Sequence, residues 1–310
     1  MKNILLTSAA LLALIFVSCE NDIVEDLALE NEQPTNQLSQ DASAWYTQFY
    51  DGFDAGSNID DRWIRTDGRT DYNSNICHYK DWNVELANFD GAECVRLQAY
   101  NAGNGEFHSG HMKTKNWASF TPGDNEEIHV KSRIKLVAYD GNYRSFNDTH
   151  GVWPAFWTVQ ETAWPTSGEI DIMEGYSHGN DPNKSSEFAS NLFYGTQAAT
   201  PGNNTNLLGN DAHRVFYGFN SDSNNGWHEY DMYWRRTGNY VSVRVVIDGV
   251  QRAYYDNSLV NNLNLNNFNT HSVILNLNVG SNDGIFQGTP NVFWNTYMYA
   301  DYVLVEKRYL

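Results

Sequence analysis

The chain has 310 residues, of which 41% are hydrophobic, and its formal net charge is −18. This acidic balance argues against nucleic-acid binding, which needs a basic surface, so no nucleic-acid partner is expected. With 10 Trp, 19 Tyr and 15 Phe but 7 Pro, the composition is typical of short strands joined by turns rather than of long helices. We therefore expect an all-β protein.

Residues 1–19 predict an export signal, because the apolar run 4–17 is too short to span a bilayer. Residues 16–19, Phe-Val-Ser-Cys, resemble a bacterial lipoprotein box, which implies lipid attachment at Cys19; the alternative is a cleaved signal with an incidental cysteine. Residues 20–42 are acidic with almost no aromatic side chains, which predicts a disordered tether. We expect a lipoprotein of the outer membrane or cell surface of a Gram-negative bacterium, which meets the membrane only through its lipid anchor.

Residues 43–310 are expected to form one large domain, because no internal linker divides them and all-β sandwiches routinely exceed 200 residues. Apolar and polar residues alternate with period two at 128–136 and 241–247, which predicts half-buried strands. Asp248-Gly249, a pair typical of hairpin turns, follows the second run. A second such pair, Asp90-Gly91, separates two further runs at 82–89 and 94–100.

Two cysteines, Cys77 and Cys94, remain once Cys19 is assigned to lipid attachment. An oxidising compartment permits a disulfide between them, but two cysteines define no framework, and each is equally consistent with a small buried residue. No Cys/His spacing typical of zinc and no HExxH run occurs. We expect no cofactor for catalysis.

The segment 168–175, Gly-Glu-Ile-Asp-Ile-Met-Glu-Gly, places three carboxylates within six residues of a predicted strand. Side chains alternate along a strand, so Glu169 and Asp171 share one face while Ile170 and Ile172 face the core. A carboxylate taken out of water costs several kcal/mol unless it is paired or hydrogen-bonded, and the cluster therefore favours a catalytic role. The alternative is a solvent-facing strand with ordinary surface charges.

Glu174 joins the acidic face only if a β-bulge absorbs one residue, and bulges are frequent next to active sites. Glu169 and Glu174 would then lie roughly 13 Å apart along the backbone. Leaning toward each other, the two carboxyl groups would approach to about 5 Å, the separation of a retaining glycosidase. Asp171 between them would raise the proton affinity of a neighbouring carboxyl or share a proton with it.

The candidate substrate-binding residues are three tryptophans and two asparagines near this segment or in a later strand. Trp153 and Trp157 share a strand face, and Trp164 precedes the acids; indole faces suit the apolar faces of sugar rings. A strand tryptophan is more often core, so at least one should be buried. Asn276 and Asn278 lie on one face of an apolar strand, which suggests hydrogen bonding to substrate or, alternatively, buried amides satisfied by backbone.

Trp-Pro-Ala-Phe-Trp at 153–157 and Trp-Pro-x-x-Gly-Glu-Ile-Asp-Ile-Met-Glu-Gly at 164–175 together resemble glycoside hydrolase family 16, and within it the laminarinase-type endo-β-1,3-glucanases. The resemblance covers roughly residues 45–310 and implies a two-sheet antiparallel β-jelly-roll sandwich with a concave substrate cleft. Weaker segments follow in the family's order: 109–115, 130–136, 227–230, 247–249, 275–280 and 301–303.

Position by position, the resemblance implies that Glu169 is the nucleophile, Glu174 the general acid/base and Asp171 the assisting carboxylate of a double displacement. Asp301 matches a ligand of the structural calcium ion common in the family, which has no catalytic role. A monomer is expected. The implied enzyme is a retaining endo-β-glycosidase that cleaves a polysaccharide.

The substrate is left open, because two regions depart from the laminarinase pattern: 121–127 and the Asn/Gly-rich stretch 176–225. Such loops carry specificity. A β-1,3-glucan or mixed-linkage β-glucan is the first expectation, and a β-galactan of agar, porphyran or host O-glycan type is the second. Transglycosylation would use the same residues. A non-catalytic surface glycan-binding lipoprotein is the alternative of another class.

Overall fold

The computed structural model describes residues 44–68, 76–179, 186–195, 214–218, 220–258, 265–280, 290 and 295–310. These residues belong to one compact unit, 40–310. The predicted signal segment, Cys19 and the tether lie outside the described residues. Within them, no helix is long and apolar enough to cross a bilayer.

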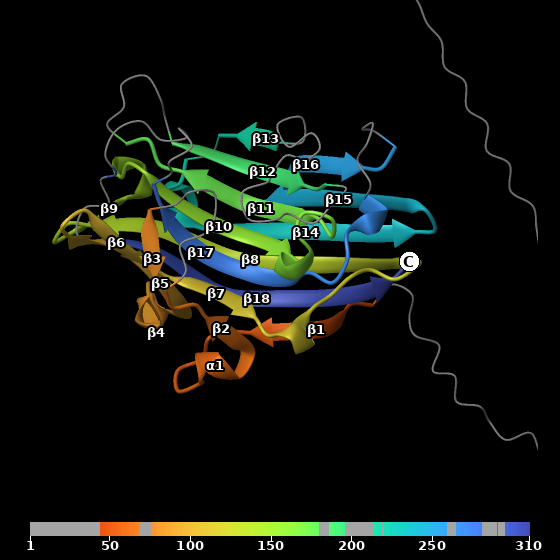
Figure 1. Ribbon diagram of the computed structural model, residues 1–310, viewed down its shortest axis with the longest axis horizontal. Helices are drawn as coiled ribbons and strands as arrows, with labels where there is room; N and C mark the ends of the chain where they lie inside the picture. The colour runs from red at the N-terminus through yellow and green to blue at the C-terminus, as the bar shows by residue number, and fades with distance from the viewer. Residues whose placement is uncertain are drawn as a thin grey trace, which may run out of the picture. The chain divides into compact units, whose positions relative to one another are not determined.

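Two β-sheets dominate the described part of the chain, and the axes of most of their strands are roughly aligned, with neighbouring strands mostly antiparallel (Figure 1). The larger sheet has eleven described strands along the path β16-β15-β14-β8-β18-β5-β6-β3, with β1 paired to β18, β4 to β5 and β9 to β8. Their bounds are Val250–Asp256 (β16), Tyr240–Ile247 (β15), Trp227–Thr237 (β14), Glu126–Tyr139 (β8), Asn295–Tyr309 (β18), Ala92–Gly103 (β5), Glu106–Ser109 (β6), Cys77–Tyr79 (β3), Tyr46–Asp51 (β1), Val84–Phe89 (β4) and Tyr143–Ser145 (β9).

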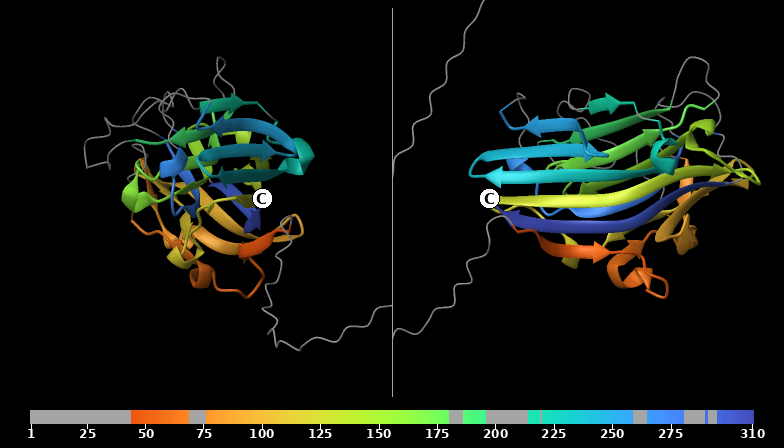
Figure 2. Two further views of the ribbon diagram at one scale, coloured as in Figure 1. Left: turned by 90° about the vertical axis from the view of Figure 1, so that its right-hand side faces the viewer. Right: turned by 180° about the vertical axis from the view of Figure 1, so that it is seen from behind.

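The smaller sheet has seven described strands in the order β13-β12-β11-β10-β17-β7-β2, and neighbouring strands pair antiparallel. Their bounds are Arg214–Tyr217 (β13), Glu187–Phe193 (β12), Glu169–Tyr176 (β11), Val152–Val159 (β10), Ser272–Val279 (β17), His111–Thr114 (β7) and Trp63–Arg65 (β2). Two further views show the same layers from the end and from behind (Figure 2).

Helix is confined to single turns in the described residues. The α-helix α1 spans Ile59–Arg62, and the 3₁₀ turns are Asp81–Asn83 (η1), Asn116–Ala118 (η2), Phe146–Asp148 (η3), Glu161–Ala163 (η4), Ser223–Gly226 (η6) and Leu265–Asn267 (η7). The prediction of an all-β sandwich is therefore confirmed.

The main core lies between the sheets, and the strands supply it by alternation. Val241, Val243, Val245 and Ile247 of β15 are fully buried in it, as the sequence period predicts. The hairpin joining β4 to β5 also forms at the predicted Asp90-Gly91 pair, where both residues have positive φ, 52° and 80°.

Cys77 on β3 and Cys94 on β5 are both buried, and no disulfide joins them. Cys77 packs in the main core, whereas Cys94 belongs to a second, smaller cluster. Burial raises the pKa of each thiol to about 12, which keeps it protonated and unreactive at neutral pH. Each of the two cysteines is therefore a small buried residue rather than half of a disulfide.

Candidate active site

The three carboxylates lie on β11, near the middle of the seven-stranded sheet. Asp171 pairs with Trp157 on β10, but Glu174 pairs with Ala155, so β11 contains one extra residue between them. The same irregularity appears against β12. Ile172 and Met173 are consecutive, yet both are fully buried in the main core. The predicted bulge is confirmed, and it returns Glu174 to the face of Asp171.

We call the face of the seven-stranded sheet that points away from the main core the site face. On β10, Val152 and Phe156 pack in the main core, whereas Trp153 and Trp157, each the next residue along the strand, belong to separate small clusters on the site face. Alternation along β11 likewise places Ile170 in the main core and the acids on the opposite side.

Both carboxylate oxygens of Glu174 are held by N–H donors from the two flanking strands. The Trp153 indole on β10 donates to Oε1 at 2.9 Å, and the Asn191 amide on β12 donates to Oε2. The side chain is buried, with 6% of its surface exposed. Glu174 is therefore fixed in one orientation before any substrate binds.

Burial raises the pKa of all three carboxyl groups, and repulsion between carboxylates adds to it at Glu169 and Asp171. Burial, followed by the charge of Glu174, raises the pKa of Glu169 to about 8, against the weaker effects of Trp164 and Asp171 beside it. The same two causes, with Glu169 added, raise the pKa of Asp171 well above its usual range. Burial also raises the pKa of Glu174, although the Arg214 charge opposes it most strongly. The cluster therefore shares protons at neutral pH, as a general acid requires.

These shifts predict that the site destabilises the fold as the pH rises. The unfolded pKa of a glutamate is about 4.3, so between that pH and about 8 the folded chain binds more protons at Glu169 than the unfolded chain does, and stability falls with pH. Glu169→Gln removes this cost. We expect equal melting temperatures for variant and wild type at pH 4 and a higher one for the variant at pH 8, by differential scanning calorimetry. A variant that is less stable at pH 8 would contradict the assignment.

The turn before Glu169 is tightly packed. Gly168 has φ +76°, and a Cβ built on it would lie 2.4 Å from the ring of Phe268. His271 supports the same turn: its Nε2 donates to the Ser167 carbonyl at 2.8 Å, while Nδ1 accepts from the Thr158 hydroxyl at 2.9 Å. The pKa of His271 is lowered to about 4 by burial, so the ring is neutral. The backbone at Glu169 is thus fixed from both sides.

Gly168→Ala is expected to displace this turn and lower activity by at least ~10-fold, because a 1 Å misplacement of a reacting group costs about that or more. Gly249→Ala is the matched control: its φ is +74°, but nothing lies within 4 Å of the added Cβ. Both variants carry the backbone strain, and the clash is specific to Gly168. Kinetic assays and urea unfolding of the two variants separate the effects. Equal activity in both would show that the packing against Phe268 is irrelevant.

Four of the five candidate substrate-binding residues hydrogen-bond one another or nearby polar groups. Trp157 Nε1 donates to Asn276 Oδ1 at 2.6 Å, and the Tyr79 hydroxyl donates to Asn278 Oδ1. Trp153 contacts Glu174, as described above. All four are buried, so the expectation of at least one buried tryptophan is confirmed. Their contact with substrate stays a prediction.

Trp164 packs beside the cluster of Trp157, and its indole N–H acts as a hydrogen-bond donor toward Glu169, which lowers the pKa of that carboxyl. The side chain therefore supports the carboxylate at the start of β11. Its contact with substrate stays a prediction.

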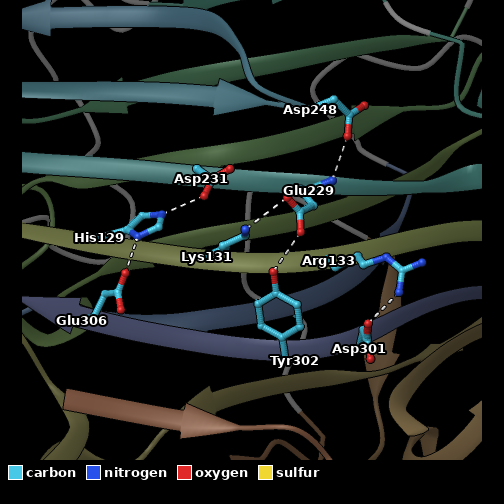
Figure 3. Close-up of polar contacts among 9 residues, drawn as sticks. All are labelled: His129, Lys131, Arg133, Glu229, Asp231, Asp248, Asp301, Tyr302 and Glu306. Atoms are coloured by element: carbon cyan, nitrogen blue, oxygen red, sulfur yellow. Dashed lines mark hydrogen bonds and ion pairs between the residues drawn. The ribbon is translucent and has the colours of Figure 1, made fainter. Parts of the chain in front are cut away.

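Asp301 lies in the other sheet, on β18, and forms an ion pair with Arg133 of β8, beside other polar contacts among β8, β14 and β18 (Figure 3). Its carboxylate accepts from Arg133 Nη1 at 2.8 Å, and the guanidinium also lies over the Trp227 ring. No group of three metal-ligating side chains occurs among the described residues. Because the carboxylate of Asp301 is already paired with the Arg133 cation, the expectation that Asp301 binds calcium gains no support.

Asn191, Arg214 and Tyr176 are the site residues that sequence reasoning did not find. Asn191 on β12 and Arg214 on β13 lie inside the stretch 176–225, which gave no aligned pattern. Every residue of β12 after Glu187 is buried, so the strand lacks the polar and apolar alternation that would have revealed it. Tyr176 follows the acidic motif, and its ring lies 5.8 Å from that of Trp153.

Comparison with known proteins shows a family to which these strands are similar. Residues 141–225 match the XgeA-like, catalytic GH16 domain. The matched segment includes β10 to β13, and therefore the three carboxylates together with Asn191 and Arg214. The GH16 match covers the part of the chain in which the site is built and supports a glycoside hydrolase.

Curated relatives agree with the GH16 match over parts of their length. A probable endo-1,3(4)-beta-glucanase of Aspergillus niger is 36% identical over 98 residues, 30% of this chain and 12% of the relative. A glucan endo-1,3-beta-glucosidase of Cryptopygus antarcticus is 29% identical over 143 residues, 42% of this chain and 46% of the relative. The chain thus spans less than half the length of these two relatives.

Among solved structures, an endo-1,3-beta-glucanase from Streptomyces sioyaensis has a similar fold. The TM-score is 0.66, with 22% identity over 86% of this chain and 98% of that chain. The predicted jelly-roll sandwich is confirmed by this likeness.

Proposed function

We propose that this protein is an endo-acting, retaining β-glycoside hydrolase. The observation that carries the proposal is the bulge in β11, which puts Glu169, Asp171 and Glu174 on one face of the sheet inside the segment that matches GH16. The raised carboxyl pKa values favour proton binding by this cluster, which a general acid needs. No redox or metal step is needed for this chemistry.

In the first step, the proton of Glu174 passes to the glycosidic oxygen of the leaving sugar while Glu169 attacks the anomeric carbon. The carbon–oxygen bond to the leaving sugar breaks, and an ester between Glu169 and the anomeric carbon forms. Trp153 and Asn191 hold the carboxylate that Glu174 becomes. Asp171 lies beside Glu169, and a shared proton between them keeps one negative charge in the pair.

In the second step, Glu174 takes a proton from water, and the oxygen of that water attacks the same carbon from the side opposite Glu169. The ester breaks, Glu169 leaves as a carboxylate, and the product keeps the original anomeric configuration because two inversions have occurred. Glu174 is protonated again and ready for the next cycle.

The substrate that we propose is a β-1,3-glucan or a mixed-linkage β-glucan. The names of the two curated relatives, an endo-1,3(4)-beta-glucanase and a glucan endo-1,3-beta-glucosidase, support this choice. An acidic protein is also a better match for a neutral glucan than for a densely sulfated galactan.

A polysaccharide panel tests the proposal: laminarin, mixed-linkage glucan, agarose, porphyran, carrageenan and mucin glycans, with products sized by chromatography. We expect new reducing ends and a ladder of oligosaccharides from laminarin or mixed-linkage glucan, and proton NMR should show the β-anomer first. Products longer than the starting oligosaccharides would indicate transglycosylation. Cleavage confined to a galactan would overturn the substrate, and no cleavage of any polymer would overturn the enzyme.

We also propose that Cys19 anchors the enzyme to a membrane surface, where it would meet polymers too large to import. The support is the residue pattern around Cys19 in the sequence. Metabolic labelling with a fatty-acid analogue should mark the wild-type chain and leave Cys19→Ser unlabelled. Labelling of that variant, or release of the wild type as a free protein, would overturn the anchor.

A further inference from the structure

Arg214 begins β13, an edge strand of the described seven-stranded sheet, and lies in register with Asp171 of β11. It pairs with Asn191 on β12, and Asn191 in turn pairs with Asp171 on β11. Side chains of paired residues stand on the same face, so all three share the site face. Arg214 Nε donates to Asn191 Oδ1 at 2.8 Å.

This contact determines which end of the Asn191 amide reaches Glu174. An amide can present either an acceptor oxygen or a donor nitrogen, and the two ends are exchanged by rotation. Arginine is a donor only, so it binds Oδ1 and leaves Nδ2 to donate to Glu174 Oε2. With Asn191 reversed, two oxygens would face each other across a buried gap. Arg214 therefore specifies the hydrogen bond that Glu174 receives.

The charge of Arg214 also lowers the pKa of Glu174 and Asp171, against the effect of burial. Several ionisable groups interact electrostatically with Glu174: Glu169, Asp171 and Tyr176 of β11, and Arg214 and Tyr217 of β13. The pKa of Tyr255 on β16 is in turn influenced by the charges of Asp171 and Arg214. The facing residues of β10 and β12, Trp153 and Asn191, are neutral. Among these groups, Arg214 is the cation.

We propose that Arg214 is a positioning residue for the general acid: through Asn191 it orients the hydrogen bond to Glu174, and its charge stabilises the carboxylate left when Glu174 gives up its proton. The inference rests on the proposed function, since it names how the acid of that reaction is tuned. Arg214 also lies over the rings of Tyr176 and Phe216, at 6.0 and 5.6 Å, so its guanidinium is held in place from several sides.

The test compares Arg214→Met, Arg214→Lys and Asn191→Leu with wild type in the full chain. The matched control is Arg244→Met, because Arg244 also lies over an aromatic ring, that of Tyr233, but belongs to the other sheet. The readouts are the pH profile of kcat/KM on laminarin and kcat on two laminaribiosides, one with a dinitrophenyl leaving group and one with a poor phenolic leaving group.

Arg214→Met should move the pH profile upward by about one pH unit, because loss of a positive charge strengthens proton binding by the carboxyl cluster. On laminarin and on the poor leaving group, kcat should fall on the order of 10- to 100-fold, since a weaker acid protonates the leaving oxygen less well. The dinitrophenyl substrate needs no acid and should lose much less. Arg214→Lys should keep the pH profile, Asn191→Leu should lower kcat, and Arg244→Met should change neither.

A raised KM with an unchanged pH profile in Arg214→Met would overturn the proposal in favour of direct sugar binding, and equal loss on both leaving groups would overturn it in favour of a merely structural role. Carboxyl ¹³C NMR titration of labelled wild type and Arg214→Met gives a readout without substrate. If wild type cleaves no polymer, the proposed function fails, yet an upward shift of the carboxyl titrations would still support the electrostatic role of Arg214. Unshifted titrations would refute that role even in an active enzyme.

Discussion

Glu169→Gln is expected to lose hydrolysis of β-1,3-glucan by roughly 10⁵-fold, because an amide cannot form the glycosyl ester through which both steps pass. The shape of the side chain is kept, so laminarin should still bind. Initial rates by a reducing-end assay, together with binding measured by calorimetry, check both expectations. The variant should also be the more stable protein at pH 8, which separates loss of chemistry from loss of fold.

Glu229→Gln is the control for this variant, because Glu229 lies on β14 of the other sheet and its side chain is 47% exposed. It should retain wild-type activity. A sharper test uses Glu169→Ala with azide and a dinitrophenyl glycoside: azide should enter the space left by the carboxylate and give the α-glycosyl azide by a single inversion. Formation of the β-azide instead would show that Glu169 is not the nucleophile.

Glu174→Ala is expected to slow hydrolysis of laminarin by roughly 10²- to 10⁴-fold, the usual contribution of a general acid/base. The loss should depend on the leaving group, because a dinitrophenolate departs without a proton. With that substrate the first step stays fast and the second becomes slow, so the glycosyl-enzyme should accumulate. A burst of dinitrophenol in stopped-flow absorbance, and the intermediate in mass spectrometry, are the measurements.

Azide distinguishes Glu174 from Glu169 by stereochemistry. In Glu174→Ala, azide needs no general base and attacks the ester at Glu169, so it should raise turnover and give the β-glycosyl azide with retained configuration. Trp153→Phe serves as the comparison, because it removes one donor to Glu174 and leaves the carboxyl itself in place. A Glu174→Ala enzyme equally impaired with good and poor leaving groups, and unresponsive to azide, would show that Glu174 is not the acid/base.

Local sequence determined the parts of this site that depend on strand period. The alternation of Glu169, Ile170 and Asp171 predicts which side chains face the core. The structure agrees, because only one orientation of the strand buries both Ile170 and Ile172. The bulge was also predictable, since without it Glu174 would lie in the main core, where an ionised carboxylate is not tolerated.

The partners of these acids depend on strand pairings that no local pattern encodes. Arg214 follows Glu174 by forty residues and reaches it because β13 adds to the sheet beyond β12, in a register set by packing on both faces. Asp301 shows the converse: its carboxylate looked available to calcium in sequence, whereas β18 and β8 together place Arg133 against it.

The acidic run that marks the site is thus a property of the sequence, because strand alternation and the cost of burying charge act over a few residues. How that run holds and releases a proton was decided by the tertiary structure. The donors Trp153 and Asn191 and the charge of Arg214 come from three other strands. Their approach to Glu174 is fixed by the register of the whole sheet, to which residues far apart in the chain contribute together.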